Sequence, residues 1–256
     1  MSLARQERRR RERQAYKDSR KKNSEAYEMD IKLLQPWSVP VLATKLPNPI
    51  LGKMLEISDE ILDDSKQQQS WGSNLAGQIK SEFLVPHEKL YEAGIMHFFM
   101  DTIRQFIIQC KCQMNPWKEE DVHAETWMTQ MLSMWIVSQY PNEYNPMHLH
   151  TQCHVSSVMY LKVPKFEPAI KSHRSDDDGS ILFVNSAGRD VELSTPNFHV
   201  SPKVGDYYIF GAHQQHAVYP YRCSEGDPDR RSVSFNAIYK SKTEYEQGLQ
   251  NEKNNS

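Results

Sequence analysis

The sequence contains no run of 18 or more apolar residues, the length that a membrane-spanning helix requires. Its amino terminus is basic and has no apolar core of the kind that secretory signal peptides carry. Cysteine is scarce, and Cys110, Cys112, Cys153 and Cys223 form neither a CxxC pair nor a regular disulfide spacing. These absences predict a soluble, cytoplasmic protein whose thiols stay reduced.

Internal repeats and low-complexity segments are also missing, apart from a basic segment at the amino terminus. Residues 1–24 contain ten Lys or Arg and three Asp or Glu, a charge of about +7 (10 − 3), so a net charge of −2 leaves about −9 (−2 − 7) for the remainder. With so few apolar residues this segment cannot fold alone, and we expect residues 1–28 to form a basic flexible tail. A solvated tail is the simplest interpretation, and attraction to an acidic partner or to nucleic acid is the alternative.

The remaining length suits one domain with a well-buried core. We expect residues 29–256 to form this domain, with helical support over about 50–115 and a core of strands over about 125–242. In the second of these regions, short β-branched and aromatic segments are separated by Gly, Pro, Asn or Asp clusters. That pattern predicts a mainly β sandwich or barrel of antiparallel strands.

Two helices are predicted upstream of the strands. The first begins near Pro49, a residue suited to the first turn of a helix, and its apolar positions continue to Leu62. The second covers residues 88–110, where apolar side chains recur on one face. Both helices are expected to contribute core packing.

The clearest chemical signal is a His-x-His pair, His148 and His150, with His216 following 66 residues after the pair. In an extended strand, residues two apart project from the same face, so the pair can bind one metal ion at adjacent positions. His216 follows the strand DYYIFGA and would reach the pair only through the fold, and His213 competes for that place. His154 lies too far along an extended strand to join them. Because histidines are also common at surfaces, the pair alone does not establish a metal site.

An arginine and a serine alternate on a later strand, RRSVSFNAIY, so that Arg230 and Ser232 share a face. A guanidinium group binds a carboxylate through two parallel hydrogen bonds, which suits an anionic co-substrate beside the metal. Arg231 has the opposite parity, and we expect it to face solvent. A surface salt bridge is the alternative for Arg230.

Substrate choice should depend on the loops around the mouth of the pocket. Trp135, Gln139, Tyr140 and Tyr144 are candidates for this role, although Trp135 also suits a core position.

Taken in order, these motifs resemble the iron(II)- and 2-oxoglutarate-dependent dioxygenases of the prolyl-hydroxylase-like superfamily, in particular a group found in phage and bacterial genomes. The resemblance covers roughly residues 125–240, with weaker similarity upstream to about residue 31. Each motif alone is weak, whereas their order and spacing together are specific. The matching positions are Asn145-Pro146 before His148, then Ser157, Val158, Tyr160 and Leu161, Gly205-Asp206, His216, Val218 and Pro220, and Arg230, Ser232, Phe235 and Asn236.

The resemblance implies a double-stranded β-helix, or jelly roll, flanked by α-helices. It implies an oxidoreductase that uses Fe(II), O2 and 2-oxoglutarate, and that hydroxylates a substrate while 2-oxoglutarate is converted to succinate and CO2. The implied metal ligands are the three histidines of the motif. The implied co-substrate residues are Arg230, Ser232 and Tyr160.

One position departs from the family pattern. Most members have Asp or Glu at His150, where it completes a triad of two histidines and one carboxylate. A histidine there removes one negative charge from the site. It leaves open a cupin-like three-histidine dioxygenase that needs no 2-oxo acid, while Glu143 is a weak candidate for a replacement carboxylate because it precedes the Asn-Pro turn.

A non-catalytic binding module on a jelly-roll scaffold is a further alternative, because one fold serves many roles. The sequence leaves open whether the substrate is a protein or a small molecule, and whether the chain forms oligomers.

Overall fold

The computed structural model describes most of the chain, and every described residue falls in one of its units, Val39–Ser256. The described ranges are 39–114, 118–168, 170, 177–185, 197–224 and 226–247. The predicted tail over 1–28 lies outside them, as do residues 171–176 and 186–196 within the region predicted to form strands. Within the described ranges, no helix has the length and apolar character needed to cross a membrane.

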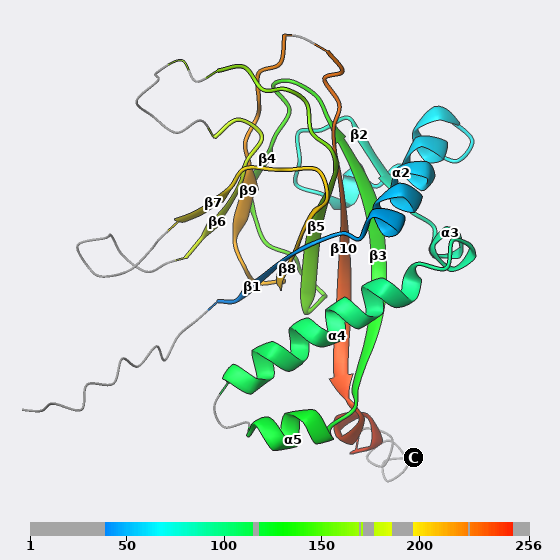
Figure 1. Cartoon of the computed structure of the whole chain (residues 1–256), viewed down its shortest axis with the longest axis vertical. Helices are drawn as coiled ribbons and strands as arrows, with labels where there is room; N and C mark the ends of the chain where they lie inside the picture. Colours follow the sequence, from blue (N-terminus) through cyan, green and yellow to red (C-terminus); the bar gives the residue numbers. More distant parts are fainter. Residues whose placement is uncertain are drawn as a thin grey trace, which may run out of the picture. The chain divides into compact units, whose positions relative to one another are not determined.

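Two antiparallel sheets form the framework (Figure 1). The larger has the strand order β1-β8-β5-β10-β3-β2, and the smaller has the order β4-β9-β6-β7. This arrangement confirms the predicted mainly β, double-stranded β-helix fold. The strands are β1 (Val41–Lys45), β2 (Ser81–Leu84), β3 (Trp127–Gln139), β4 (Asn145–His148), β5 (Val155–Lys162), β6 (Ile181–Val184), β7 (Asn197–Val200), β8 (Asp206–Gly211), β9 (His216–Val218) and β10 (Arg230–Ser241).

Helices pack against one face of the larger sheet, beside β3 and β10 in Figure 1. The longest packs its apolar face on this sheet, where the ring of Phe99 lies 6.2 Å from that of Phe235 and 6.3 Å from that of Tyr207, measured between centroids. The prediction that α-helices flank the strands is therefore confirmed. Among the described residues the helices are α2 (Asn48–Asp63), α3 (His87–Glu92), α4 (Met96–Gln113) and α5 (Glu119–Ala124), with one 3-10 turn at Gly72–Asn74.

The first predicted helix is α2, but the single helix expected over 88–110 is wrong. The structure divides it into α3 and α4 around Gly94, which adopts φ +69°. Glycine accepts this left-handed conformation without a Cβ penalty and commonly follows the end of a helix. Apolar spacing could not reveal the break, because Leu90 and Ile95 are both buried on either side of it.

Strand β10 divides its side chains between the two faces of the larger sheet. Val233 and Phe235 join the core beneath the helices, whereas Arg230, Ser232 and Ser234 line a pocket on the opposite face. A strand sends successive side chains to opposite faces, which accounts for this division. Because β10 pairs with both β3 and β5, its pocket face is at the middle of the sheet.

Candidate active site

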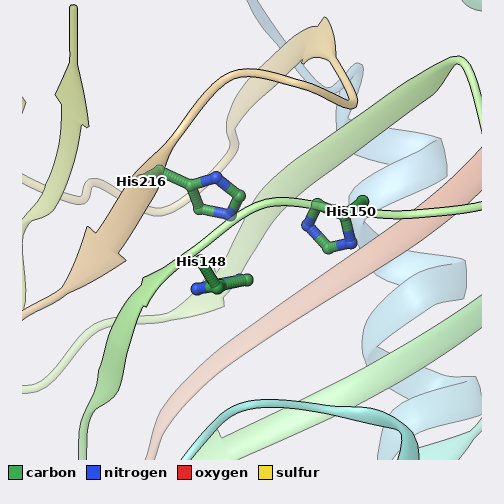
Figure 2. Close-up of side chains that lie close together, drawn as sticks. All are labelled: His148, His150 and His216. Carbon is green, nitrogen blue, oxygen red and sulfur yellow. The ribbon is translucent and has the colours of Figure 1, made fainter. Parts of the chain in front are cut away.

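Three histidines converge on the pocket between the sheets. One ring nitrogen from each of His148, His150 and His216 lies within 4.8 Å of the others, and the ring centroids of His148 and His216 are 4.2 Å apart. Figure 2 shows the three rings gathered from β4, from the segment just after it, and from β9. We call these three residues the histidine cluster. Among the described residues it is the only group of three or more His, Cys, Asp or Glu placed to bind a metal ion.

Backbone carbonyls orient two of the rings. His148 Nδ1 lies 2.7 Å from the carbonyl oxygen of Pro146, and His216 Nδ1 lies 2.9 Å from that of Gln214. Since a carbonyl only accepts hydrogen bonds, each Nδ1 must carry the proton and each Nε2 must be left with a free lone pair. This arrangement, in which the outer nitrogen donates to a carbonyl, is how metal-binding histidines are held.

Burial keeps the histidine cluster uncharged. It lowers the pKa of His148, and together with the nearby His148 it lowers the pKa of His150 to about 4. Burial and then His148 lower the pKa of His216 to about 3. Neutral imidazoles are the form that binds metals, so the cluster is ready to do so at neutral pH.

The histidine pair is held differently from the way its spacing suggested. His148 is the last residue of β4, and His150 lies beyond the strand, where its N–H donates to the carbonyl oxygen of Ala212 at 2.9 Å. The prediction that one strand aims both rings is therefore wrong. Neither His213 nor His154 joins the cluster. The ring of His154 packs on Tyr239, and His213 lies against Gly211.

Arg230 lies in the same pocket and is almost completely buried, with 1% of its surface exposed. Its Nε donates to the carbonyl oxygen of Gly179 at 3.0 Å, and its Nη1 donates to Oε1 of Gln139 at 2.9 Å. The guanidinium carbon lies 5.0 Å from the ring centroid of Tyr160. These neighbours hold the group in one orientation but include no carboxylate, and burial lowers the pKa of Arg230.

Three buried polar groups around this arginine make no hydrogen bond of normal geometry. They are Nη2 of Arg230, the hydroxyl of Tyr160 and the hydroxyl of Ser180, the residue after Gly179. The guanidinium of Arg230 lies close enough to the Tyr160 hydroxyl to interact with it, but the O–H of Tyr160 has no acceptor. Ser232 lines the pocket on the same face of β10 and is 4% exposed. Buried polar groups normally have partners, so unpaired donors beside a buried cation indicate a site for an anion.

Of the four residues predicted to select a substrate, three lie at the pocket or are exposed as a rim requires, and one does not. Trp135 lines the pocket, with its ring centroid 6.0 Å from that of His150. Tyr140 and Tyr144 are each 41% exposed, which suits a pocket rim. Gln139 is completely buried and supports Arg230, so its prediction as a mouth residue is wrong. It ends β3 directly opposite Arg230, where the sheet covers it.

Arg231 does not face solvent as expected. Only 6% of its surface is exposed, because α2 covers this face of β10. Its guanidinium pairs with Asp229 at 2.6 Å and with Asp59 of α2, and Nη1 donates to Oγ of Ser58 at 2.9 Å. Strand parity placed Arg231 opposite to Arg230 correctly, but parity does not reveal which face is covered by a helix.

Sequence reasoning missed two polar residues of this region, Ser180 and Glu82. Glu82 lines the pocket from β2 and is 2% exposed. Neither belongs to a histidine or arginine motif, so no local pattern singles them out. The only available signal was a carboxylate, Glu82, within a short strand that follows a loop containing Trp71.

Residues 133–236 match a protein-family model described as "Putative 2OG-Fe(II) oxygenase". The matched segment contains the histidine cluster and Arg230. The match is to the family that the motif order predicted, and it covers less than half of the chain. No curated protein matches the chain.

Several solved structures are similar to this chain at low sequence identity. A 2OG-Fe(II) oxygenase family oxidoreductase from Burkholderia pseudomallei is 18% identical with a TM-score of 0.32, and the match covers 43% of each chain. A Pseudomonas putida prolyl-4-hydroxylase is 18% identical with a TM-score of 0.47, over 78% of this chain and 93% of that chain. HygX from Streptomyces hygroscopicus, solved with nickel and 2-oxoglutarate, is 11% identical with a TM-score of 0.47, over 78% of this chain and 83% of that chain. The match thus spans less than half of the Burkholderia protein.

Proposed function

We propose that the protein is a 2-oxoglutarate-dependent oxygenase, a hydroxylase whose Fe(II) is bound by the histidine cluster and whose 2-oxoglutarate is anchored at Arg230. When bound, the metal and the co-substrate supply the oxidising chemistry, in which 2-oxoglutarate and O2 give succinate, CO2 and a hydroxylated substrate. The protein supplies ligands, orientation and exclusion of water. The observation that carries the proposal is the presence, in one pocket, of three neutral imidazoles and a buried arginine without a carboxylate partner.

The donor set fits a divalent iron ion. Imidazole nitrogen is an accepted ligand of Fe(II), and two of the rings are already held with Nε2 as the free donor. Because all three donors are neutral, the bound ion would keep its full charge of +2 until an anion arrives. A dianionic co-substrate would neutralise it, so the histidine at position 150 favours 2-oxoglutarate binding electrostatically.

The arginine fits the far carboxylate of 2-oxoglutarate. Nη2 of Arg230 and the hydroxyls of Tyr160 and Ser180 are buried donors that still lack an acceptor. Ser232 lies on the same pocket face and can add one hydrogen bond. A carboxylate accepts up to four hydrogen bonds, so it can pair the donors that the protein leaves unpaired.

Anaerobic absorption spectroscopy tests this proposal. Adding Fe(II) and then 2-oxoglutarate to the protein should produce a visible charge-transfer band, and admitting O2 should release succinate. His216→Ala should abolish the band, and Arg230→Met should require far more 2-oxoglutarate to produce it. A three-histidine dioxygenase without a 2-oxo acid, which His150 by itself would favour, predicts O2 consumption that neither omission of 2-oxoglutarate nor Arg230→Met reduces.

A further inference from the structure

A buried carboxylate occupies the pocket at some distance from the arginine. Glu82 is on β2 and lines the same pocket as His148 and Arg230, with 2% of its surface exposed. Both of its carboxylate oxygens are buried and have no hydrogen-bond partner. An ionised carboxylate without partners is costly to bury, so it needs either a proton or a positively charged neighbour.

The surrounding loop comes close to the Glu82 carboxylate but donates no hydrogen bond to it. A Cβ placed on Gly77 would lie 3.0 Å from Oε1 of Glu82, and one on Gly72 would lie 3.2 Å from Oε2. The two glycines therefore let the backbone come close on both sides of the carboxylate. No donor of this loop bonds to it, which leaves both oxygens available to a ligand in the pocket.

The neighbouring acid, Glu143, is in a different situation. Its carboxylate accepts hydrogen bonds from the N–H groups of Tyr140 at 2.9 Å and of Lys80 at 3.3 Å, so it serves the local backbone. Burial, and then the charge of Glu143, raises the pKa of Glu82 to about 7. Only Glu82 of this pair lines the pocket.

Strand register separates Glu82 from the co-substrate end of the pocket. Glu82 is paired with Val137, Val137 with Ser232, and Ser232 with Tyr160, so the four residues form one row across the sheet. Adjacent strands are about 4.8 Å apart, which places Glu82 about 10 Å from Ser232. Arg230 donates its hydrogen bonds to Gly179 and Gln139 and not to Glu82, so the two charged side chains of the pocket do not form an ion pair.

We infer that Glu82 binds a cationic group of the primary substrate, an ammonium or a guanidinium. The inference rests on the proposed function, because it assumes that the substrate carbon to be hydroxylated lies in the space between Glu82 and the histidine cluster. One wall of this space is aromatic: Trp135 pairs with Leu84 on β2 and so lies diagonal to Glu82, and its ring centroid is 6.0 Å from that of His150. A carboxylate next to an aromatic face is an arrangement that favours an organic cation.

A cation suits Glu82 better than a neutral donor would. The carboxylate offers only acceptors and is not compensated by any charge of the protein, so a neutral amide would leave a net buried charge. A bound ammonium or guanidinium supplies both donors and the opposite charge. The same residue discriminates against substrates that carry an acid at this position, because two carboxylates would repel each other.

Matched probes test the inference on the full chain loaded anaerobically with Fe(II) and 2-oxoglutarate. N-acetyl-L-lysine methylamide is compared with its norleucine counterpart, and N-acetyl-L-arginine methylamide with its citrulline counterpart, both free and within ten-residue peptides. Binding is read from the change that each probe causes in the charge-transfer band. In the wild type, at least one cationic probe should act at about 10- to 100-fold lower concentration than its neutral counterpart, as expected for a hydrogen bond to a charged group.

Glu82→Gln should remove this preference while leaving the band and the 2-oxoglutarate affinity unchanged, which also shows that the variant is folded. Glu120→Gln, which removes an exposed carboxylate on α5, should keep the preference. Equal action of the charged and neutral probes in the wild type, no action of either cationic probe in either form, or a preference that persists in Glu82→Gln would each overturn the inference. Absence of the band before any probe is added would instead contradict the proposed function. The free and peptide arms tell a small-molecule substrate from a protein.

Discussion

Arg230 and Arg231 are neighbours in the chain and both are buried, yet they have opposite surroundings. Arg231 lies under α2 between two carboxylates, Asp59 and Asp229, whose charges and hydrogen bonds outweigh burial and raise its pKa. Arg230 faces the pocket, bonds only to neutral oxygens, and has its pKa lowered by burial. Burial alone therefore does not distinguish a structural arginine from a binding one, whereas the presence or absence of a carboxylate partner does.

The largest expected effect is on stability, from Arg231→Met. Removing this side chain leaves Asp229, which is 5% exposed, without its cation. Breaking a buried ion pair in this way costs about 3–5 kcal/mol, so the urea midpoint should fall sharply. The matched control is Lys162→Met, because Lys162 is partly exposed and lies 3.4 Å from Asp59. A loss in Arg231→Met no greater than that of the control would contradict the structural role.

Arg230→Met should weaken co-substrate binding and should not reduce stability. Loss of a charged partner for a buried carboxylate weakens binding by about 100-fold or more, so 2-oxoglutarate affinity should fall by at least that factor. Stability should stay equal or rise, because the change removes a buried charge that has no counter-ion. Calorimetry with 2-oxoglutarate and thermal unfolding check both results. An affinity within threefold of the wild type would remove Arg230 from the co-substrate site.

Glu82 is, like Arg230, a buried charge of the pocket without an oppositely charged partner, and Glu82→Gln tests its effect on stability. The folded-state pKa of Glu82 is raised from 4.5 to about 7, so the folded protein holds this proton more tightly than the unfolded chain does. The stability cost is absent below pH 4.5, grows as the pH rises to about 7, and is constant above it. We expect Glu82→Gln to be more stable by about 2 kcal/mol at pH 8, after allowing for partial solvent screening, and to equal the wild type at pH 4.

That difference is measured by denaturant titration at the two pH values. Glu143, the histidine cluster and Arg230 are the other ionisable groups near Glu82, and all are retained in the variant. An equal difference at both pH values would show that packing rather than charge is responsible.

The smallest effect is expected from His150→Asp, which brings a carboxylate into the histidine cluster. The metal site should survive, since carboxylates are also Fe(II) ligands, but the added negative charge should weaken 2-oxoglutarate binding by about 10-fold. His150→Asn, which keeps the position neutral, is the control. Tighter 2-oxoglutarate binding in the Asp variant would show that the third imidazole does not favour the anion.

Much of the site was predictable because its motifs are local. Alternation in a strand placed Arg230 and Ser232 on one face, and the order of the motifs named the three histidines that the structure brings together. The way in which the His150 side chain is positioned was not predictable. β4 ends at His148, so His150 lies beyond the strand, where its backbone N–H bonds to the carbonyl oxygen of Ala212 on another segment.

The sequence by itself determined the strand-rich core, the first long helix and the set of metal and co-substrate candidates, because short-range periodicity and side-chain chemistry are properties of adjacent residues. The tertiary structure alone decided which face of β10 a helix covers, and thus that Arg231 is paired while Arg230 is not. It also brought Glu82 into the pocket of the histidine cluster, some 66 residues before His148. β2 pairs with β3, which lies far from it in the sequence, so this contact is long-range. No local sequence pattern shows that Glu82 becomes buried in the pocket.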